Sequence, residues 1–192
     1  MRTRPYHHND LSACLAIFDS NLPIYFAPEE RPDFASFLRE LADEHAYQVI
    51  ELDGSVVACG GLSPPTNGTA GFCWGMVEKS RHGQGLGRHL ARVRLQQAAT
   101  DPRVERIALS TSQHTEGFYA GLGFRVTQRV TDGHGPGIHA VHMEVRLQQI
   151  HAMRGWHATP YAPKNTPAPK AERNLKNRYR RRLHPTHGPL PR

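Results

Sequence analysis

A glycine-rich segment, Arg81 to Gly87 (RHGQGLG), most constrains how this chain of 192 residues can fold, because it lies between a strand-like run and a helix-like run. The preceding run, Thr69 to Val77, carries no charge and is rich in apolar and aromatic residues, which predicts a buried strand. After the glycines, apolar residues recur at helical spacing until Asp101-Pro102 ends the pattern. Glycines let successive N–H groups converge on an anion at a helix N-terminus, so the sequence predicts a phosphate-binding turn here.

Two common phosphate-binding loops differ from this segment in their spacing. A dinucleotide-binding fingerprint requires a third glycine where Arg88 stands, and the Gly-Lys-Ser/Thr of a Walker loop does not occur in the sequence. The remaining pattern, His82-x-x-Gly85-x-Gly87, resembles the pyrophosphate loop of the GCN5-related N-acetyltransferase (GNAT) superfamily. That loop has the pattern Arg/Gln-x-x-Gly-x-Gly/Ala, so a histidine replaces the usual Arg or Gln in this chain.

A second segment strengthens the resemblance. Residues Arg106 to Ser112 predict a strand, and Thr115 to Phe124 predict a short helix that ends at glycines before another strand begins. The corresponding signature of the family ends in Tyr-x-x-Leu-Gly-Phe, which is matched by Tyr119, Leu122, Gly123 and Phe124. The two motifs agree with the family in their order and separation.

The resemblance covers about residues 1 to 149 and extends to the order of elements. Hydrophobic periodicity predicts two amphipathic helices first, then a hairpin around Asp53-Gly54, and a final half-buried strand. These elements span residues 11–18, 34–41, 47–52, 55–62 and 141–147, with a weaker strand at 2–6. The predicted order, β-α-α-β-β-β-α-β-α-β-β, is the order of the family's α+β fold, an α/β sandwich built on a mixed central sheet.

Charge divides the chain into two parts. Residues 1–150 hold 14 basic and 16 acidic residues, whereas residues 151–192 hold 10 basic residues and one acid. The second part also has seven of the fifteen prolines and few periodic apolar residues. We therefore expect an acetyltransferase domain at 1–149 and a basic, Pro-rich, disordered tail at 150–192. A solvated tail without a partner is favoured over one that binds nucleic acid.

The remaining composition excludes several classes of protein. No apolar run approaches the roughly 20 residues of a membrane span, and no signal-peptide core follows the N-terminus, so we expect a cytoplasmic protein. Cys14, Cys59 and Cys73 lie inside apolar patterns and are expected in the core; Cys73 as a nucleophile is the less favoured alternative. The 13 histidines are scattered, so no metal is expected.

The resemblance implies an acetyl-CoA site and one catalytic residue. Tyr119 is implied as the general acid that protonates the departing thiolate. The resemblance also implies three contacts to the donor. The backbone at the strand end before the glycines pairs with the pantetheine arm, and a serine contacts the pantetheine. The glycine loop holds the pyrophosphate. The residues of these three contacts are Met76, Val77, His82, Gly83, Gln84, Gly85, Leu86, Gly87, Arg88 and Ser112.

Neither the general base nor the acceptor follows from the motifs. His114, Glu116 and His139 lie at predicted strand ends and are candidate bases, although each is more typical of a surface residue. The segment 21–30 mixes aromatic residues, prolines and two glutamates that would attract a cationic amine, and the glycine-rich loop 131–138 is a second candidate for the acceptor side.

The favoured function is an N-acetyltransferase that moves an acetyl group from acetyl-CoA to a primary amine of a small molecule or peptide. Direct attack of the amine on the thioester is implied. Two alternatives stay open: a non-catalytic acyl-CoA-binding regulatory module, and a nucleic-acid-associated protein that binds through its basic tail. The presence of Tyr119 favours the enzyme, and the confinement of positive charge to the tail limits the nucleic-acid alternative.

Overall fold

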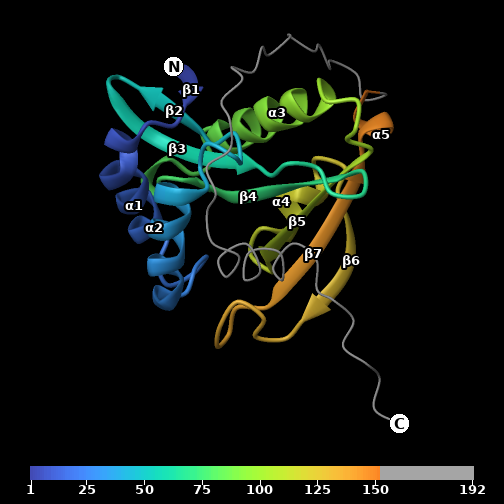
Figure 1. Cartoon of the computed structure of the whole chain (residues 1–192). Helices are drawn as coiled ribbons and strands as arrows, with labels where there is room; N and C mark the ends of the chain where they lie inside the picture. Colours follow the sequence, from blue (N-terminus) through green and yellow to red (C-terminus); the bar gives the residue numbers. More distant parts are fainter. Residues whose placement is uncertain (152–192) are drawn as a thin grey trace.

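A seven-stranded mixed sheet is the centre of the computed structural model, which describes residues 1–151 (Figure 1). Its spatial order is β1-β2-β3-β4-β5-β7-β6, and only β4 and β5 pair in parallel. The strands are β1 (Arg2–Pro5), β2 (Gln48–Leu52), β3 (Ser55–Leu62), β4 (Thr69–Val77), β5 (Arg106–Ser112), β6 (Arg125–Val130) and β7 (Ala140–Arg146). The helices are α1 (Leu11–Ser20), α2 (Arg31–Glu40), α3 (Leu86–Ala99), α4 (Glu116–Ala120) and α5 (Leu147–His151). Three 3-10 turns precede α1, α2 and α3: η1 (His8–Asp10), η2 (Pro28–Glu30) and η3 (Lys79–Arg81).

The order of elements confirms the predicted α+β fold, and most elements form where the sequence pattern placed them. β4 and β5 have the predicted bounds. The β2–β3 turn has positive φ angles at Asp53 (52°) and Gly54 (78°), as a two-residue hairpin turn requires. α4 ends at Ala120, before Gly121 and Gly123, as predicted, and β6 begins at Arg125, one residue after the predicted Phe124.

Helices cover both faces of the sheet. α1 and α2 lie over one face, where Phe18, Phe34, Phe37 and Trp74 form an aromatic core with close ring contacts (Figure 1). α3 and α4 contribute to the second core on the opposite face, together with side chains of β5 and β7. The sheet is therefore buried between two helical layers along most of β3 and β4.

The C-terminal end of the domain differs from the sequence interpretation. The alternating pattern predicted a strand through Leu147, but β7 ends at Arg146 and Leu147 begins α5. Leu147 is buried in either arrangement, so hydrophobicity alone does not distinguish them. The structure does not describe residues 152–192, so the predicted basic, Pro-rich tail lies outside the described part of the chain.

The predicted burial of the cysteines is confirmed. Cys14, Cys59 and Cys73 are all buried free thiols. Burial raises the pKa of the Cys73 thiol to about 12, so the thiol stays protonated at neutral pH. This state fits a core residue and argues against Cys73 as a nucleophile.

Candidate functional site

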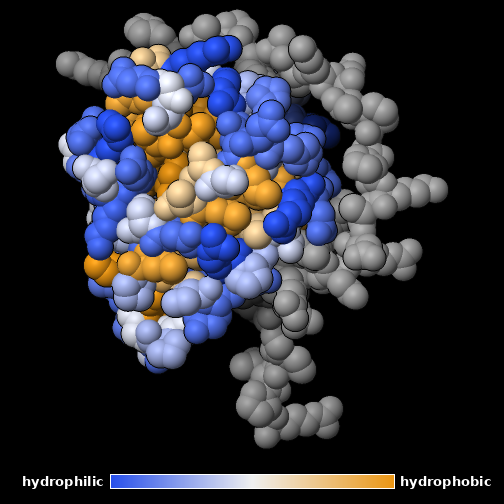
Figure 2. All heavy atoms as spheres, turned by 90° about the vertical axis from the view of Figure 1, so that its left-hand side faces the viewer, coloured by the Kyte–Doolittle hydropathy of each residue, from blue (hydrophilic) through white to orange (hydrophobic). Residues whose placement is uncertain are grey.

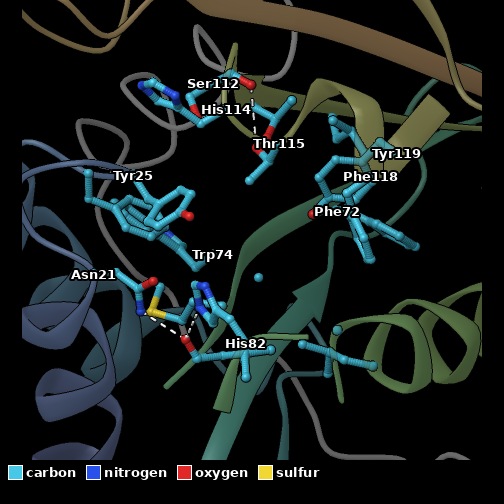
Figure 3. A pocket seen from close by; sticks show the side chains of 18 of the residues that line it. Asn21, Tyr25, Phe72, Trp74, His82, Ser112, His114, Thr115, Phe118 and Tyr119 are labelled. Atoms are coloured by element: carbon cyan, nitrogen blue, oxygen red, sulfur yellow. Dashed lines mark hydrogen bonds between the residues drawn. The ribbon is translucent and has the colours of Figure 1, made fainter. Parts of the chain in front are cut away.

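A cleft opens where two neighbouring strands separate. β4 and β5 pair only through Thr69–Gly71 and Arg106–Ala108, so the sheet is open beyond these residues. A cavity of about 460 Å³ occupies this opening, and Figure 3 shows side chains from both strands and from the surrounding helices directed toward it. Main-chain groups of a separated strand pair lack strand partners on the cleft side, which suits them to pair with an extended ligand.

A β-bulge in β4 shapes one wall of this cleft. The register between β3 and β4 shifts after Cys59, and Trp74 on the bulged strand has φ of 43°, which is unusual for a bulky residue. The Tyr47 hydroxyl donates a hydrogen bond to the Trp74 carbonyl at 2.8 Å. Burial raises the pKa of Tyr47, which keeps this hydroxyl a neutral donor. The bulge is thus held in place from the α1–α2 side.

The glycine-rich turn forms the N-terminal end of α3 at the mouth of the cleft. Gly83 and Gly85 have φ angles of 78° and 84°, and Gly85 is the N-cap residue. The first intrahelical bond runs from His89 N–H to the Gly85 carbonyl, and no side chain caps this end. The amides of the first turn are therefore open to an anion, and the helix dipole favours negative charge there.

Two side chains around this turn, Arg81 and His82, already bind other groups of the protein and are therefore less available to bind a ligand. Arg81 donates to Glu78 at 3.2 Å, so its charge is partly neutralised. His82 Nε2 donates to the Val77 carbonyl at 3.0 Å, and Asn21 Nδ2 donates to the same oxygen at 2.9 Å. Two donors fill both lone pairs of this carbonyl. Any pairing of β4 with a ligand must then use other main-chain groups.

The opposite wall carries Tyr119 and Ser112, which lie on α4 and β5. Tyr119 packs edge-on against Phe118 and Phe124, with ring centroids 4.9 and 5.6 Å apart. Within residues 1–151 its hydroxyl has no hydrogen-bond partner, so it can donate to a ligand in the cleft (Figure 3). Ser112 is buried at the end of β5, and its carbonyl accepts a hydrogen bond from the Thr115 N–H at 3.1 Å.

Both segments that the sequence singled out for the acceptor contribute to the lining of the cavity, 131–138 through His134. From 21–30, four residues line the cavity: Asn21, Tyr25, Phe26 and Glu30. Glu30 is buried and accepts a hydrogen bond from the Ala27 N–H at 2.9 Å, whereas Glu29 is exposed and does not line the cavity. On the side of α1 and α2, the surface carries a broad hydrophobic area bordered by hydrophilic residues (Figure 2).

Of the three candidate bases, one lines the cavity. His114 lines it, and its ring lies 6.2 Å from the Tyr25 ring. Glu116 instead pairs with Arg129 at 2.7 Å, and His139 Nδ1 accepts a hydrogen bond from the Asp132 N–H. Neither of these two lines the cavity.

The structure brings together ten of the eleven predicted site residues. Those that line the cavity are Met76, Val77, His82, Gly83, Gly85, Leu86, Gly87, Arg88, Ser112 and Tyr119. Gln84 does not line it, because it is exposed at the outer side of the turn. No group of three metal-ligating side chains occurs in the described part of the chain. In the same part, no helix is both long and apolar enough to cross a bilayer.

Several polar residues of the cavity, among them His134 and Arg94, were not singled out from the sequence. His134, from the loop 131–138, lies 3.0 Å from Ser110 Oγ through its Nε2. Arg94 lies on the buried face of α3 and also lines the cavity. Its position four residues after Leu90 and eight after Leu86 places it on the apolar stripe of the helix, and this spacing was a usable signal.

Comparison with known proteins agrees with this geometry. A model of the acetyltransferase (GNAT) family matches residues 14–124. Among solved structures, ribosomal-protein-S18-alanine N-acetyltransferase from Escherichia coli has a TM-score of 0.63 and 18% identity, covering 76% of this chain and 93% of that one. An aminoglycoside 6'-N-acetyltransferase complexed with coenzyme A has a TM-score of 0.62 and 14% identity, covering 77% and 97%. No match was found among curated proteins. The family match spans more than half of the sequence and includes both motifs of the cleft, so the chain belongs to the GNAT acetyltransferase family.

Proposed function

We propose that the protein is an N-acetyltransferase that transfers an acetyl group from acetyl-CoA to a primary amine of a small molecule or peptide. The observation that carries this proposal is the uncapped glycine turn of α3, which opens onto the gap between β4 and β5 where Tyr119 lies. An anion site that opens into an extended cleft lined by a tyrosine suits a phosphorylated thioester donor.

The donor would lie along the cleft with its pyrophosphate at the helix end. The amides from His82 to Arg88 would bind the pyrophosphate, and Arg88 adds positive charge because it is exposed and forms no ion pair within residues 1–151. The pantetheine arm would run beside Met76 and Val77 and reach Ser112. The Val77 carbonyl already accepts two hydrogen bonds, so it would position the loop instead of binding the pantetheine.

The chemistry needs a deprotonated amine and a proton for the thiolate. The amine nitrogen attacks the thioester carbon, the C–N bond forms, and the C–S bond breaks to give an amide and coenzyme A. Tyr119 would protonate the departing thiolate through its hydroxyl, which lines the cavity and has no hydrogen-bond partner within residues 1–151. His114 would take the proton from the amine, directly or through one water molecule.

The structural relatives support the proposed identity of the donor but do not indicate the identity of the acceptor. One neighbour carries coenzyme A in its structure, which supports the same donor here. The neighbours act on different acceptors by their names, an aminoglycoside and a ribosomal-protein alanine, at similar TM-scores. The acceptor therefore has to be found by experiment.

Thiol release from acetyl-CoA tests the proposal. The full chain would be incubated with acetyl-CoA and a panel of polyamines, amino acids, aminoglycosides and peptides. We expect acceptor-dependent thiol release, with an acetylated product of the corresponding mass. Binding of coenzyme A without thiol release for any acceptor would contradict the enzyme and favour an acyl-CoA-binding module.

A further inference from the structure

Arg94 is a buried cation at the cleft. It lies in the third turn of α3, has only 2% of its surface exposed, and lines the cavity between β4 and β5. Its side chain is the largest of the fully buried side chains in the described residues. Arginine remains charged at all physiological pH values, so this position places a full positive charge inside the fold.

The protein fits closely around the guanidinium group but leaves part of it unpaired. The group lies 4.0 Å from the centre of the Phe72 ring. A Cβ atom added at Gly75 would lie 2.8 Å from Nη1, and one at Gly60 would lie 3.2 Å from it, so both glycines are needed for the group to fit. Its Nε donates weakly to the Leu90 carbonyl at 3.4 Å. Nη1 is buried without any hydrogen-bond partner.

No carboxylate of the described chain neutralises this charge. Within residues 1–151, all the ion pairs involve other basic residues. Removing a charge from water without a partner is unfavourable, and the ring contact with Phe72 offsets only part of that penalty. A buried, shaped and unpaired guanidinium next to a ligand cavity is suited to bind an anionic group of the ligand.

The position of Arg94 shows which part of a ligand it would meet. Phe72 and Leu109 are the first residues beyond the paired part of β4 and β5, so Arg94 lies at the closed end of the cleft. Its Cα is nine residues after Gly85, about 13 Å along the helix axis, and its guanidinium turns back by about one turn to lie against Phe72 and Gly75 of β4 instead of the phosphate-binding turn. The anion at Arg94 is thus not the pyrophosphate but a group at the thioester end of the donor.

We propose that Arg94 binds a terminal carboxylate on the acyl group, so that the cleft accepts, besides acetyl-CoA, coenzyme A thioesters of short dicarboxylic acids and binds them more tightly than uncharged acyl thioesters of matched length. Malonyl and succinyl thioesters represent this class, and acetyl-CoA is the smallest donor that fits the same cleft. The inference rests on the proposed acyl transfer and specifies the acyl group. The transfer step is unchanged: the C–S bond breaks, the C–N bond forms, and the amide product keeps the free carboxylate.

The acceptor is a less suitable source of this carboxylate. Arg94 belongs to α3, on the face of the sheet opposite α1 and α2. The segment that supplies the acceptor side, 21–30, joins α1 to α2, and its cavity-lining carboxylate, Glu30, favours a cationic group over an acid. A carboxylate bound by Arg94 therefore belongs to the donor.

The test compares matched pairs of donors by calorimetry on the full chain. Malonyl-CoA is paired with butyryl-CoA and succinyl-CoA with pentanoyl-CoA, so each pair differs mainly in the terminal carboxylate. We expect the wild type to bind the carboxylated member at least about tenfold more tightly, because a charge-assisted hydrogen bond is stronger than a neutral one. Arg94→Met should bring this ratio close to one, whereas Arg92→Met, an exposed change of equal charge on the same helix, should leave it unchanged.

The outcomes separate this inference from the proposed function. Failure of the wild type to bind coenzyme A at all would contradict the proposed function. Binding of all thioesters with no preference for a carboxylate would overturn the role of Arg94 alone. If Arg94→Met melts at a lower temperature than the wild type, Arg94→Lys provides the second measurement. It keeps the charge without the planar fork, and should retain a reduced preference for the carboxylated donors. A preference that is as large as in the wild type in either folded variant would also overturn the inference.

Discussion

The side of the cleft that we propose for the donor and the side that we propose for the acceptor are built in different ways. On the donor side, main-chain amides at Gly83, Gly85 and their neighbours form the site, and positive φ angles hold them in place. On the acceptor side, side chains from the loops 21–30 and 131–138 line the cavity. A main-chain site depends on glycine spacing and leaves a motif in the sequence, whereas a site made of loop side chains leaves none. This difference explains why the sequence predicts a donor, a coenzyme A thioester, but does not predict the identity of the acceptor amine.

The largest expected effect comes from Tyr119, which would act between the two sides. Tyr119→Phe removes the hydroxyl but keeps the ring contacts with Phe118 and Phe124, so folding and acetyl-CoA affinity should scarcely change. Turnover should fall by about 10² to 10⁴, because general-acid assistance is lost. Steady-state thiol release and calorimetry on the same variant measure the two quantities. Turnover within a few-fold of the wild type would show that another group protonates the thiolate.

A substitution at the glycine turn should affect the donor side alone. Gly85→Glu places a negative charge where the pyrophosphate would bind and should weaken coenzyme A affinity by at least about 100-fold, as measured by calorimetry. Gly85→Ala is the matched control: a Cβ there meets no atom within 4 Å, but its φ of 84° imposes the same backbone strain. Equal losses in both variants would attribute the effect to strain, and unchanged affinity in Gly85→Glu would place the pyrophosphate elsewhere.

A substitution at Glu30 should affect the acceptor side alone. Glu30→Gln keeps the shape of the side chain but removes a negative charge that lines the cavity. We expect the KM of a cationic amine to rise by about tenfold, equivalent to about 1.4 kcal/mol, with no change in acetyl-CoA affinity. Glu29→Gln, at an exposed neighbouring position, is the control and should leave both unchanged. A parallel loss of donor affinity would show that the two sides are not independent.

The smallest effect is expected from the part of the chain beyond the cleft. Both sides of the cleft lie within residues 1–151, and α5 ends at His151. A chain that ends after His151 should therefore keep its acetyl-CoA affinity and melt within about 5 °C of the full chain, a difference of about 1 kcal/mol. Calorimetry and thermal unfolding measure both. A larger fall in the melting temperature would mean that the basic segment packs on the domain.

Periodicity and turn chemistry were enough to predict most of the elements, and the family resemblance supplied the fold in which they assemble. The alternating and helical patterns gave the bounds of β4 and β5, and Asp53-Gly54 marked the hairpin. The start of α5 was missed because Leu147 is apolar and buried in both a strand and a helix. The bulge at Trp74 left no signal, since it depends on the register between two strands.

The site could be predicted where it uses the main chain and only in part elsewhere. The glycine turn and Tyr119 follow from short motifs. Arg94 was missed because an arginine in a helix is normally assigned to the solvated face, and only its spacing from Leu86 and Leu90 indicates burial. The bond between His82 and the Val77 carbonyl requires the fold, because the loop must turn back on β4 before the two groups meet.

Backbone amide NMR with coenzyme A tests the central claim most directly, because it locates the donor on the folded protein without an acceptor. Titration of the labelled full chain should shift the amides of Gly83, Gly85 and Gly87 most, with smaller saturable shifts at Met76, Val77 and Ser112 along the two walls of the cleft. The amide signals of the edge strand β1 and of its neighbour β2, which do not line the cavity, should not shift. Saturable shifts confined to other parts of the molecule, or no shifts at millimolar coenzyme A, would contradict the account.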